Sequence, residues 1–174
     1  MNKKDAKALT FIQGIAARHN KRARLKALEY KVLAEQSLAS RETAGDGHFY
    51  LACAFLQEHK FGNAEQELAE AFESPRRRIR NYDIYDFLRE VYQEKGDYEK
   101  KAEAITKMIE TGAREGLYCT GRENLGADTE ILVDALVMAG KEDVARQVFS
   151  EYRDLIDAET AKRIAEELEV KDLD

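Results

Sequence analysis

Apolar side chains recur at helical spacing along most of the 174-residue chain. In three places a trio of residues expected to face the core is followed, after a short turn, by a stretch with apolar residues at i, i+3 or i+4, and i+7. This spacing is typical of amphipathic helices that bury one face. The trios are centred on Leu51-Ala52-x-x-Phe55, Leu88-Arg89-x-x-Tyr92 and Leu132-Val133-x-x-Leu136. The second stretches contain Ala64, Leu68, Ala71 and Phe72, then Ala102, Ile105, Met108 and Ile109, then Ala145, Val148, Phe149 and Tyr152.

The turns between the paired helices fall at residues 58–61, 95–98 and 139–142. Gly96 and Gly140 are expected to end the preceding helices with positive φ, which glycine adopts without a steric penalty. Asp157 is a candidate N-cap for a last helix. The residues expected to face inward from that helix are Ala161, Ile164, Ala165 and Leu168.

Two further helices are expected before the paired ones, over residues 4–19 and about 22–42. The first has an apolar stripe of Leu9, Ile12, Ile15 and Ala16, and the second has one of Leu25, Leu28, Val32 and Leu33. We expect both helices to flank or cap the paired ones, because the end of a helical repeat array must hide its apolar face.

The paired helices resemble the tetratricopeptide repeat, a helix-turn-helix unit of about 34 residues with a Trp-x-x-Leu-Gly-x-x-Tyr…Ala-x-x-x-Phe…Pro signature. The resemblance covers residues 45 to about 155, and the string Gly96-Asp97-Tyr98-Glu99-Lys100 carries most of it. Departures include His48, Tyr85 and Thr129 in place of tryptophan. The spacing from His59 to Gly96 and on to Gly140 is 37 and then 44 residues, so we expect a glycine-rich loop over 112–128.

The fold class that follows is all-α. The resemblance implies a right-handed solenoid of helical hairpins, with N-terminal helices over 1–44, three hairpins over 45–155, and a C-terminal capping helix and tail over 156–174. An ordinary antiparallel helical bundle is the alternative, since both architectures use the same amphipathic helices.

Charge is distributed unevenly along the chain, whose net charge is −6. Residues 1–32 hold nine lysines and arginines against Asp5 and Glu29, a net +7, so the remaining residues carry −13. Such asymmetry indicates an interaction surface or arm.

The two cysteines, Cys53 and Cys119, lack metal-ligand spacing, which favours a reducing cytoplasm. No segment approaches the roughly 20 apolar residues that a membrane span requires.

Catalytic patterns are absent from the sequence. The three histidines, His19, His48 and His59, are scattered, and no nucleophile elbow or phosphate-binding loop accompanies them. Cys119 has no neighbouring histidine in the sequence. We therefore expect a non-enzymatic protein without cofactor or metal.

The first helices of tetratricopeptide repeats line a groove that receives a peptide, and helical spacing indicates which face of this chain would match it. That face contains the candidate partner-binding residues Phe49, Cys53, Leu56, Asp86, Glu90, Glu94, Glu130 and Asp134. The groove is thus expected to be apolar at one end and acidic along the rest. This composition favours a basic or amphipathic peptide with an apolar anchor and disfavours an acidic tail.

Two other arrangements are compatible with the charge pattern. The basic N-terminal helices would suit the acidic groove of the same chain or of a neighbour, the latter giving a homo-oligomer. Alternatively, these helices and the Arg76–Arg80 run would bind nucleic acid or another anionic surface. We rank the second lower, because no known nucleic-acid reader motif accompanies the arginines and the body of the chain is acidic.

Overall fold

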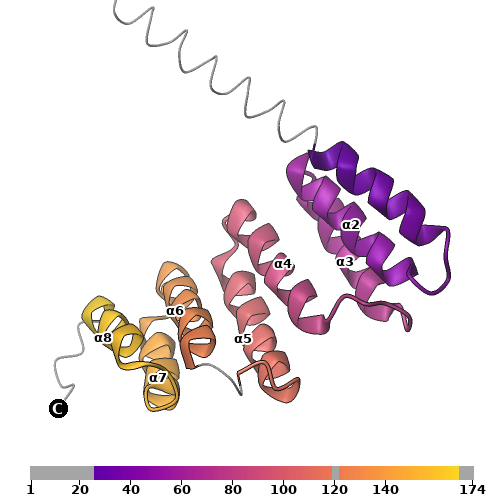
Figure 1. Cartoon of the computed structure of the whole chain (residues 1–174). Helices are drawn as coiled ribbons and strands as arrows, with labels where there is room; N and C mark the ends of the chain where they lie inside the picture. The colour runs from indigo at the N-terminus through magenta and orange to yellow at the C-terminus, as the bar shows by residue number, and fades with distance from the viewer. Residues whose placement is uncertain (1–25, 119–121, 169–174) are drawn as a thin grey trace, which may run out of the picture. The chain divides into compact units, whose positions relative to one another are not determined.

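The structure is a computed structural model that describes residues 26–118 and 122–168 (Figure 1). Within these ranges every regular element is a helix, which confirms the all-α prediction. A helix over 26–38 is followed by α2 (Ala44–Gln57), α3 (Phe61–Glu73), α4 (Asn81–Lys95), α5 (Tyr98–Arg114), α6 (Arg122–Met138), α7 (Glu142–Tyr152) and α8 (Ala158–Glu167). None of the described helices is long and apolar enough to cross a membrane. The expected helix over 4–19 and Cys119 lie outside the described residues.

The chain divides into two compact units, Met1–Ile79 (unit 1) and Arg80–Asp174 (unit 2). The division falls between the first and the second of the predicted hairpins.

In unit 1, α2 and α3 form a hairpin whose turn places His59 in the left-handed region, with φ of 57°. The 26–38 helix runs antiparallel along α2, because Leu38 lies against Gly47 at one end and Lys31 pairs with Glu58 at the other. The buried residues of the 26–38 helix are Ala27 and Ala34, seven positions and two turns apart. Small side chains at this spacing allow two helix backbones to approach closely.

The apolar stripe of the 26–38 helix does not pack on the hairpin. Leu28, Val32 and Leu33 are 58, 53 and 41% exposed. The helix flanks the hairpin as expected, but it does so through its alanine face, and these three larger side chains are exposed.

The segment after α3 is fastened to unit 1 by hydrogen bonds. The Asp46 carboxylate, only 6% exposed, accepts bonds from the backbone N–H groups of Arg78 (2.7 Å) and Ile79 (3.0 Å). The Arg77 guanidinium donates to the carbonyls of Ala71 (2.7 Å) and Phe72 (3.1 Å), and so satisfies acceptors at the C-terminal end of α3.

In unit 2, α4 packs on α5, α5 on α6, and α6 on both α7 and α8 (Figure 1). The predicted turns are confirmed, since Gly96 and Gly140 have φ of 70° and 71°. Asp157 caps α8 as predicted by accepting a bond from the Thr160 N–H at 2.9 Å. The inward positions predicted for α5 and α8 are all buried, namely Ala102, Ile105, Met108, Ile109, Ala161, Ile164, Ala165 and Leu168.

The long glycine-rich loop predicted over 112–128 is wrong, because α5 continues to Arg114 and α6 begins at Arg122. Two glycines of the segment are helical and make room for neighbours. A Cβ at Gly112 would lie 2.7 Å from the Tyr118 hydroxyl, and one at Gly126 would lie 2.8 Å from the Asp157 carboxylate. Glycine marks close approach at these positions and not a turn.

Candidate partner-binding surface

Carboxylates occupy successive turns on one face of α4. Asp86, Glu90 and Glu94 are spaced four residues apart, and the side chains of the first two are 43 and 48% exposed. Arg89 donates two hydrogen bonds to Asp86, at 2.9 and 2.7 Å, and lies 3.8 Å from Glu90. Partial burial is the main cause that raises the pKa of Glu90. Arg89 opposes this rise, while the charges of Asp86 and Glu94 add to it.

A second group of carboxylates lies between α6 and α8. Glu130 accepts two bonds from Arg163 of α8, at 2.8 and 2.9 Å, and these bonds lower the pKa of Glu130. Asp134, one turn further along α6, lies beside Glu167. Burial, then a hydrogen bond to Asp134 and its charge, raise the pKa of Glu167. The two carboxylates therefore crowd each other.

Lys101 of α5 connects the two groups. Its side chain is buried, with only 7% of the residue exposed, and Nζ donates to the Gln93 side chain of α4 at 2.6 Å. Burial lowers the pKa of Lys101, whereas the charge of nearby Asp134 raises it. Since Lys101 is close to both Gln93 and Asp134, the carboxylates of α4 and α6 belong to one region of unit 2.

We call this region the acidic surface and define it by Asp86, Glu90, Glu94, Glu130, Asp134 and Glu167. Three cations contact or neighbour it: Arg89, Lys101 and Arg163. Six carboxylates against three cations leave a net negative charge. Five of the eight predicted binding residues lie in the acidic surface. Glu167 and the three cations were not predicted, because they come from other helices or from positions assigned to the core.

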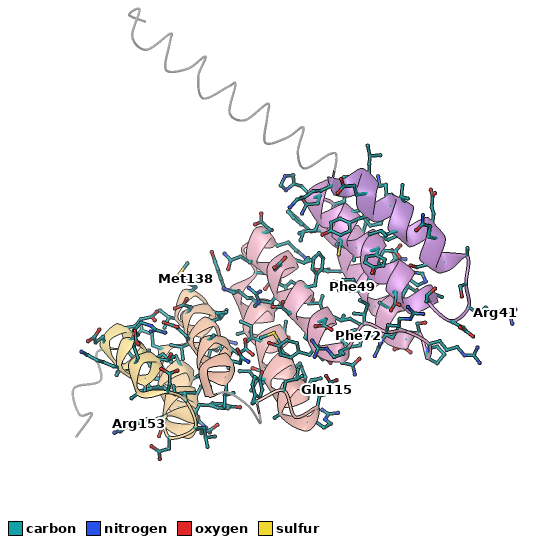
Figure 2. All side chains as sticks on the ribbon, viewed as in Figure 1. Arg41, Phe49, Phe72, Glu115, Met138 and Arg153 are labelled. Atoms are coloured by element: carbon teal, nitrogen blue, oxygen red, sulfur yellow. The ribbon has the colours of Figure 1, made fainter. Side chains whose placement is uncertain are left out.

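The other three predicted binding residues belong to unit 1. Cys53 and Leu56 are 4 and 8% exposed, so they offer little surface to a partner. Phe49, labelled in Figure 2, is half-buried. It makes an edge-to-face contact with Tyr50, with ring centroids 6.2 Å apart. The predicted apolar end of the groove is therefore largely interior.

A cavity of about 330 Å³ opens at the starts of α4 and α6. It is lined by Arg80, Tyr82, Leu117, Tyr118, Asn124, Ala127 and Asp128, and we call it the Asp128 pocket. Asp128 is 8% exposed, and its Oδ2 atom accepts bonds from the hydroxyls of Tyr118 (2.7 Å) and Tyr82 (3.0 Å). No described residue donates to Oδ1.

Burial raises the pKa of Asp128, although the two tyrosine hydrogen bonds lower it. The charge of Asp86 also raises this pKa, which indicates that the Asp128 pocket adjoins the acidic surface. Arg80, which also lines the pocket, is already paired with Asp83 through bonds of 3.0 and 2.8 Å. The Asp128 carboxylate is thus a polar group of the pocket that is not paired with a described cation.

No local pattern in the sequence indicates this pocket, since Tyr82 and Asp128 are 46 residues apart. The Arg76–Arg80 run does stand out in the sequence, but two of its arginines have structural partners: Arg77 bonds to carbonyls of α3 and Arg80 to Asp83. The side chains of the other two, Arg76 and Arg78, are exposed.

Among the described residues no group of His, Cys, Asp and Glu side chains is arranged to hold a metal ion. Comparison of the chain with known protein families, with curated proteins and with solved structures finds no match.

Proposed function

We propose that this chain is a non-enzymatic adaptor that binds a basic or amphipathic segment of another protein along the acidic surface of unit 2. The proposal includes a tetratricopeptide-like arrangement of the hairpins and a cytoplasmic setting. The observation that carries it is the excess of crowded carboxylates on α4, α6 and α8. Like charges at such short range raise each other's energy, and a lysine or arginine from a partner relieves that cost.

The Asp128 pocket supplies the anchor site in this proposal. Leu117 and Ala127 line it with apolar surface, and the carboxylate of Asp128 is the acidic group of the lining. A lysine side chain matches this arrangement, because its aliphatic stem packs on apolar surface while its ammonium group binds a carboxylate. The partner segment would place one lysine in the pocket and further basic residues along the acidic surface.

The test uses fluorescence anisotropy with a panel of labelled peptides that differ in charge and in apolar content. We expect lysine- and arginine-rich amphipathic peptides to bind the wild-type chain, and the double variant Glu90→Lys/Asp134→Lys to abolish this binding. The matched control is Glu70→Lys/Glu73→Lys on α3, which changes the net charge equally in an exposed part of unit 1. Equal affinity of the wild type and the Glu90/Asp134 variant would refute the proposal.

The competing function, binding of nucleic acid or another anionic surface, receives less support. Arg77 and Arg80 are engaged within their own units, so fewer arginines of the run are available to neutralise phosphates. The same assay distinguishes the two functions. Generic RNA or DNA should show no binding at physiological salt, and a salt-dependent complex that survives the Glu90/Asp134 substitutions would favour the alternative.

A further inference from the structure

The exposed apolar face of the 26–38 helix is unusual for unit 1. Leu28 and Val32 lie one turn apart and are each more than half exposed, and Leu33, beyond Glu29 on the helix surface, is 41% exposed. Exposed apolar side chains are common singly, but a contiguous group on one helix indicates a surface that packs against something. The α2–α3 hairpin does not supply that cover, because it contacts the opposite, alanine-bearing face.

We propose that residues 4–19 of the same chain form an amphipathic helix that folds back onto this face. Their sequence places Leu9, Ile12, Ile15 and Ala16 on one side of a helix. A helix of 16 residues is about 24 Å long and the 26–38 helix about 20 Å, so the two lengths match. This interaction is independent of the peptide binding proposed for the acidic surface.

The connection between the two helices suits an antiparallel pair. Six residues, 20–25, separate them, within the 2–8 residues usual for helix–helix connections. Asn20 follows directly after the first segment, and asparagine is one of the few residues other than glycine that adopts the left-handed conformation that ends a helix. The segment therefore reaches the exposed face without extending far from it.

Charge favours the same arrangement. Glu29 and Glu35 are exposed on the 26–38 helix, beside Leu28 and Val32. The segment over 4–19 contains Lys4, Lys7 and Arg18 and only one acidic residue. The segment therefore carries a net positive charge, which is attracted to a face that displays Glu29 and Glu35.

A second copy of the chain is the rival occupant of this face. The short connection gives the chain's own segment an effective concentration in the millimolar range, which exceeds the working concentration of most proteins. A pairing of two 26–38 helices would also bring Glu29 and Glu35 near their own copies. Both considerations favour the intrachain contact.

The test is hydrogen exchange measured by mass spectrometry on the full chain, with one substitution on each side of the contact. Ile12→Asp should make amides of residues 26–38 exchange about tenfold faster, the change expected when the burial of one aliphatic side chain is lost. Reciprocally, Val32→Asp should accelerate exchange in residues 4–19 by a similar factor. Analytical ultracentrifugation should give a monomer for the wild type and for both variants.

Two control variants introduce an aspartate at positions outside the proposed contact. Thr10→Asp lies on the opposite side of the helix expected over 4–19, and Val144→Asp lies on α7 of unit 2, where Val144 is 44% exposed. Neither should alter exchange in residues 4–38. Exchange in α3 reports whether Val32→Asp disturbs the fold of unit 1. If Val32→Asp does disturb it, the result for Ile12→Asp alone tests the contact between residues 4–19 and 26–38, because Ile12 lies outside the described helices.

Three results would overturn the proposal. One is the absence of a reciprocal effect between residues 4–19 and 26–38. Another is a dimer that Val32→Asp dissociates, which would assign the face to a second copy. The third is exchange in residues 4–19 that responds to Glu90→Lys and not to Val32→Asp, which would place the segment on the acidic surface instead.

Discussion

The two compact units bury different kinds of side chain. Of the largest side chains that are less than 2% exposed, unit 1 contributes only Leu68 among its described residues. Unit 2 contributes Ile84, Val91, Ile105, Met108, Ile109, Thr129, Val133 and Ile164. The interior of unit 1 consists mostly of alanines: Ala27, Ala34, Ala52, Ala54, Ala64 and Ala71.

This difference shows two ways of stabilising a small group of helices. Alanines bring backbones close together but remove little apolar area from water, whereas isoleucine, leucine and phenylalanine each contribute much more. Unit 1 compensates with polar contacts such as Asp46 with the 78–79 backbone and His48 with Glu67, whose side chains are 2.8 Å apart. We therefore expect unit 1 to be the less stable of the two.

The largest effect is expected from removing equivalent core side chains. Leu68→Ala and Ile105→Ala each delete a fully buried side chain and should each cost about 3 kcal/mol. Leu68→Ala should then remove the exchange protection of α2 and α3 in unit 1. Ile105→Ala should leave unit 2 folded, because the other large side chains of unit 2 remain packed. Hydrogen exchange resolved by unit measures this. If Ile105→Ala removed the protection of unit 2 while Leu68→Ala left unit 1 protected, unit 1 would not be the less stable unit.

An intermediate effect is expected where glycines let helices approach. A Cβ at Gly47 would meet the Leu38 backbone nitrogen at 3.0 Å, so Gly47→Ala should destabilise unit 1 by about 2 kcal/mol. Gly126→Ala meets the more yielding Asp157 side chain and should cost about 1 kcal/mol in unit 2. Gly62→Ala, with nothing within 4 Å, should stabilise α3 by about 0.5 kcal/mol. Urea denaturation would show this order, and equal effects at all three sites would argue against close approach.

The smallest effect is expected from pH, with opposite signs in the two units. Hydrogen bonds from Lys31 and Lys60 lower the pKa of Glu58, so its contribution to unit 1 is present above the pKa of the unfolded chain and is lost as the pH falls. Burial raises the pKa of Asp128, so its contribution to unit 2 is greatest at low pH and is lost as the pH rises through the folded pKa.

Substitutions isolate these two contributions. Glu58→Gln should reduce the loss of unit 1 stability between pH 7 and pH 4, and Asp128→Asn should remove the corresponding gain in unit 2. The measurement is the free energy of opening of each unit, obtained from hydrogen exchange across that range. Parallel pH profiles for the wild type and each variant would show that the carboxylates do not titrate in the inferred directions.

Helix positions and core-facing residues were largely predictable from the sequence. The 3.6-residue periodicity identified Ile105, Met108 and Ile164, and the turn glycines Gly96 and Gly140 were correctly assigned. These features depend on local spacing and backbone preference, which a single sequence contains. The bounds of α6 were not predictable, because Gly126 gives the same local signal whether it ends a helix or accommodates a neighbouring one.

The site was predictable only in part. Helical spacing placed Asp86, Glu90 and Glu94 on one face, because their relation is local. The pairing of Glu130 with Arg163 and the convergence of Tyr82 and Tyr118 on Asp128 depend on which helices are neighbours. The outward direction of Leu28 and Val32 also could not be predicted, since two alanines on the other face make the closer helix contact.

The hydrogen bonds that fasten the segment after α3 have a consequence for proteolysis. The Arg76–Arg80 run offers trypsin-like proteases several cleavage sites in a short stretch outside the helices. Cleavage requires the substrate backbone to detach and extend in the protease cleft, but Asp46 holds the N–H groups of Arg78 and Ile79, and Arg77 holds the end of α3. Susceptibility at this stretch therefore follows the opening of unit 1 and not the surface exposure of the arginine side chains.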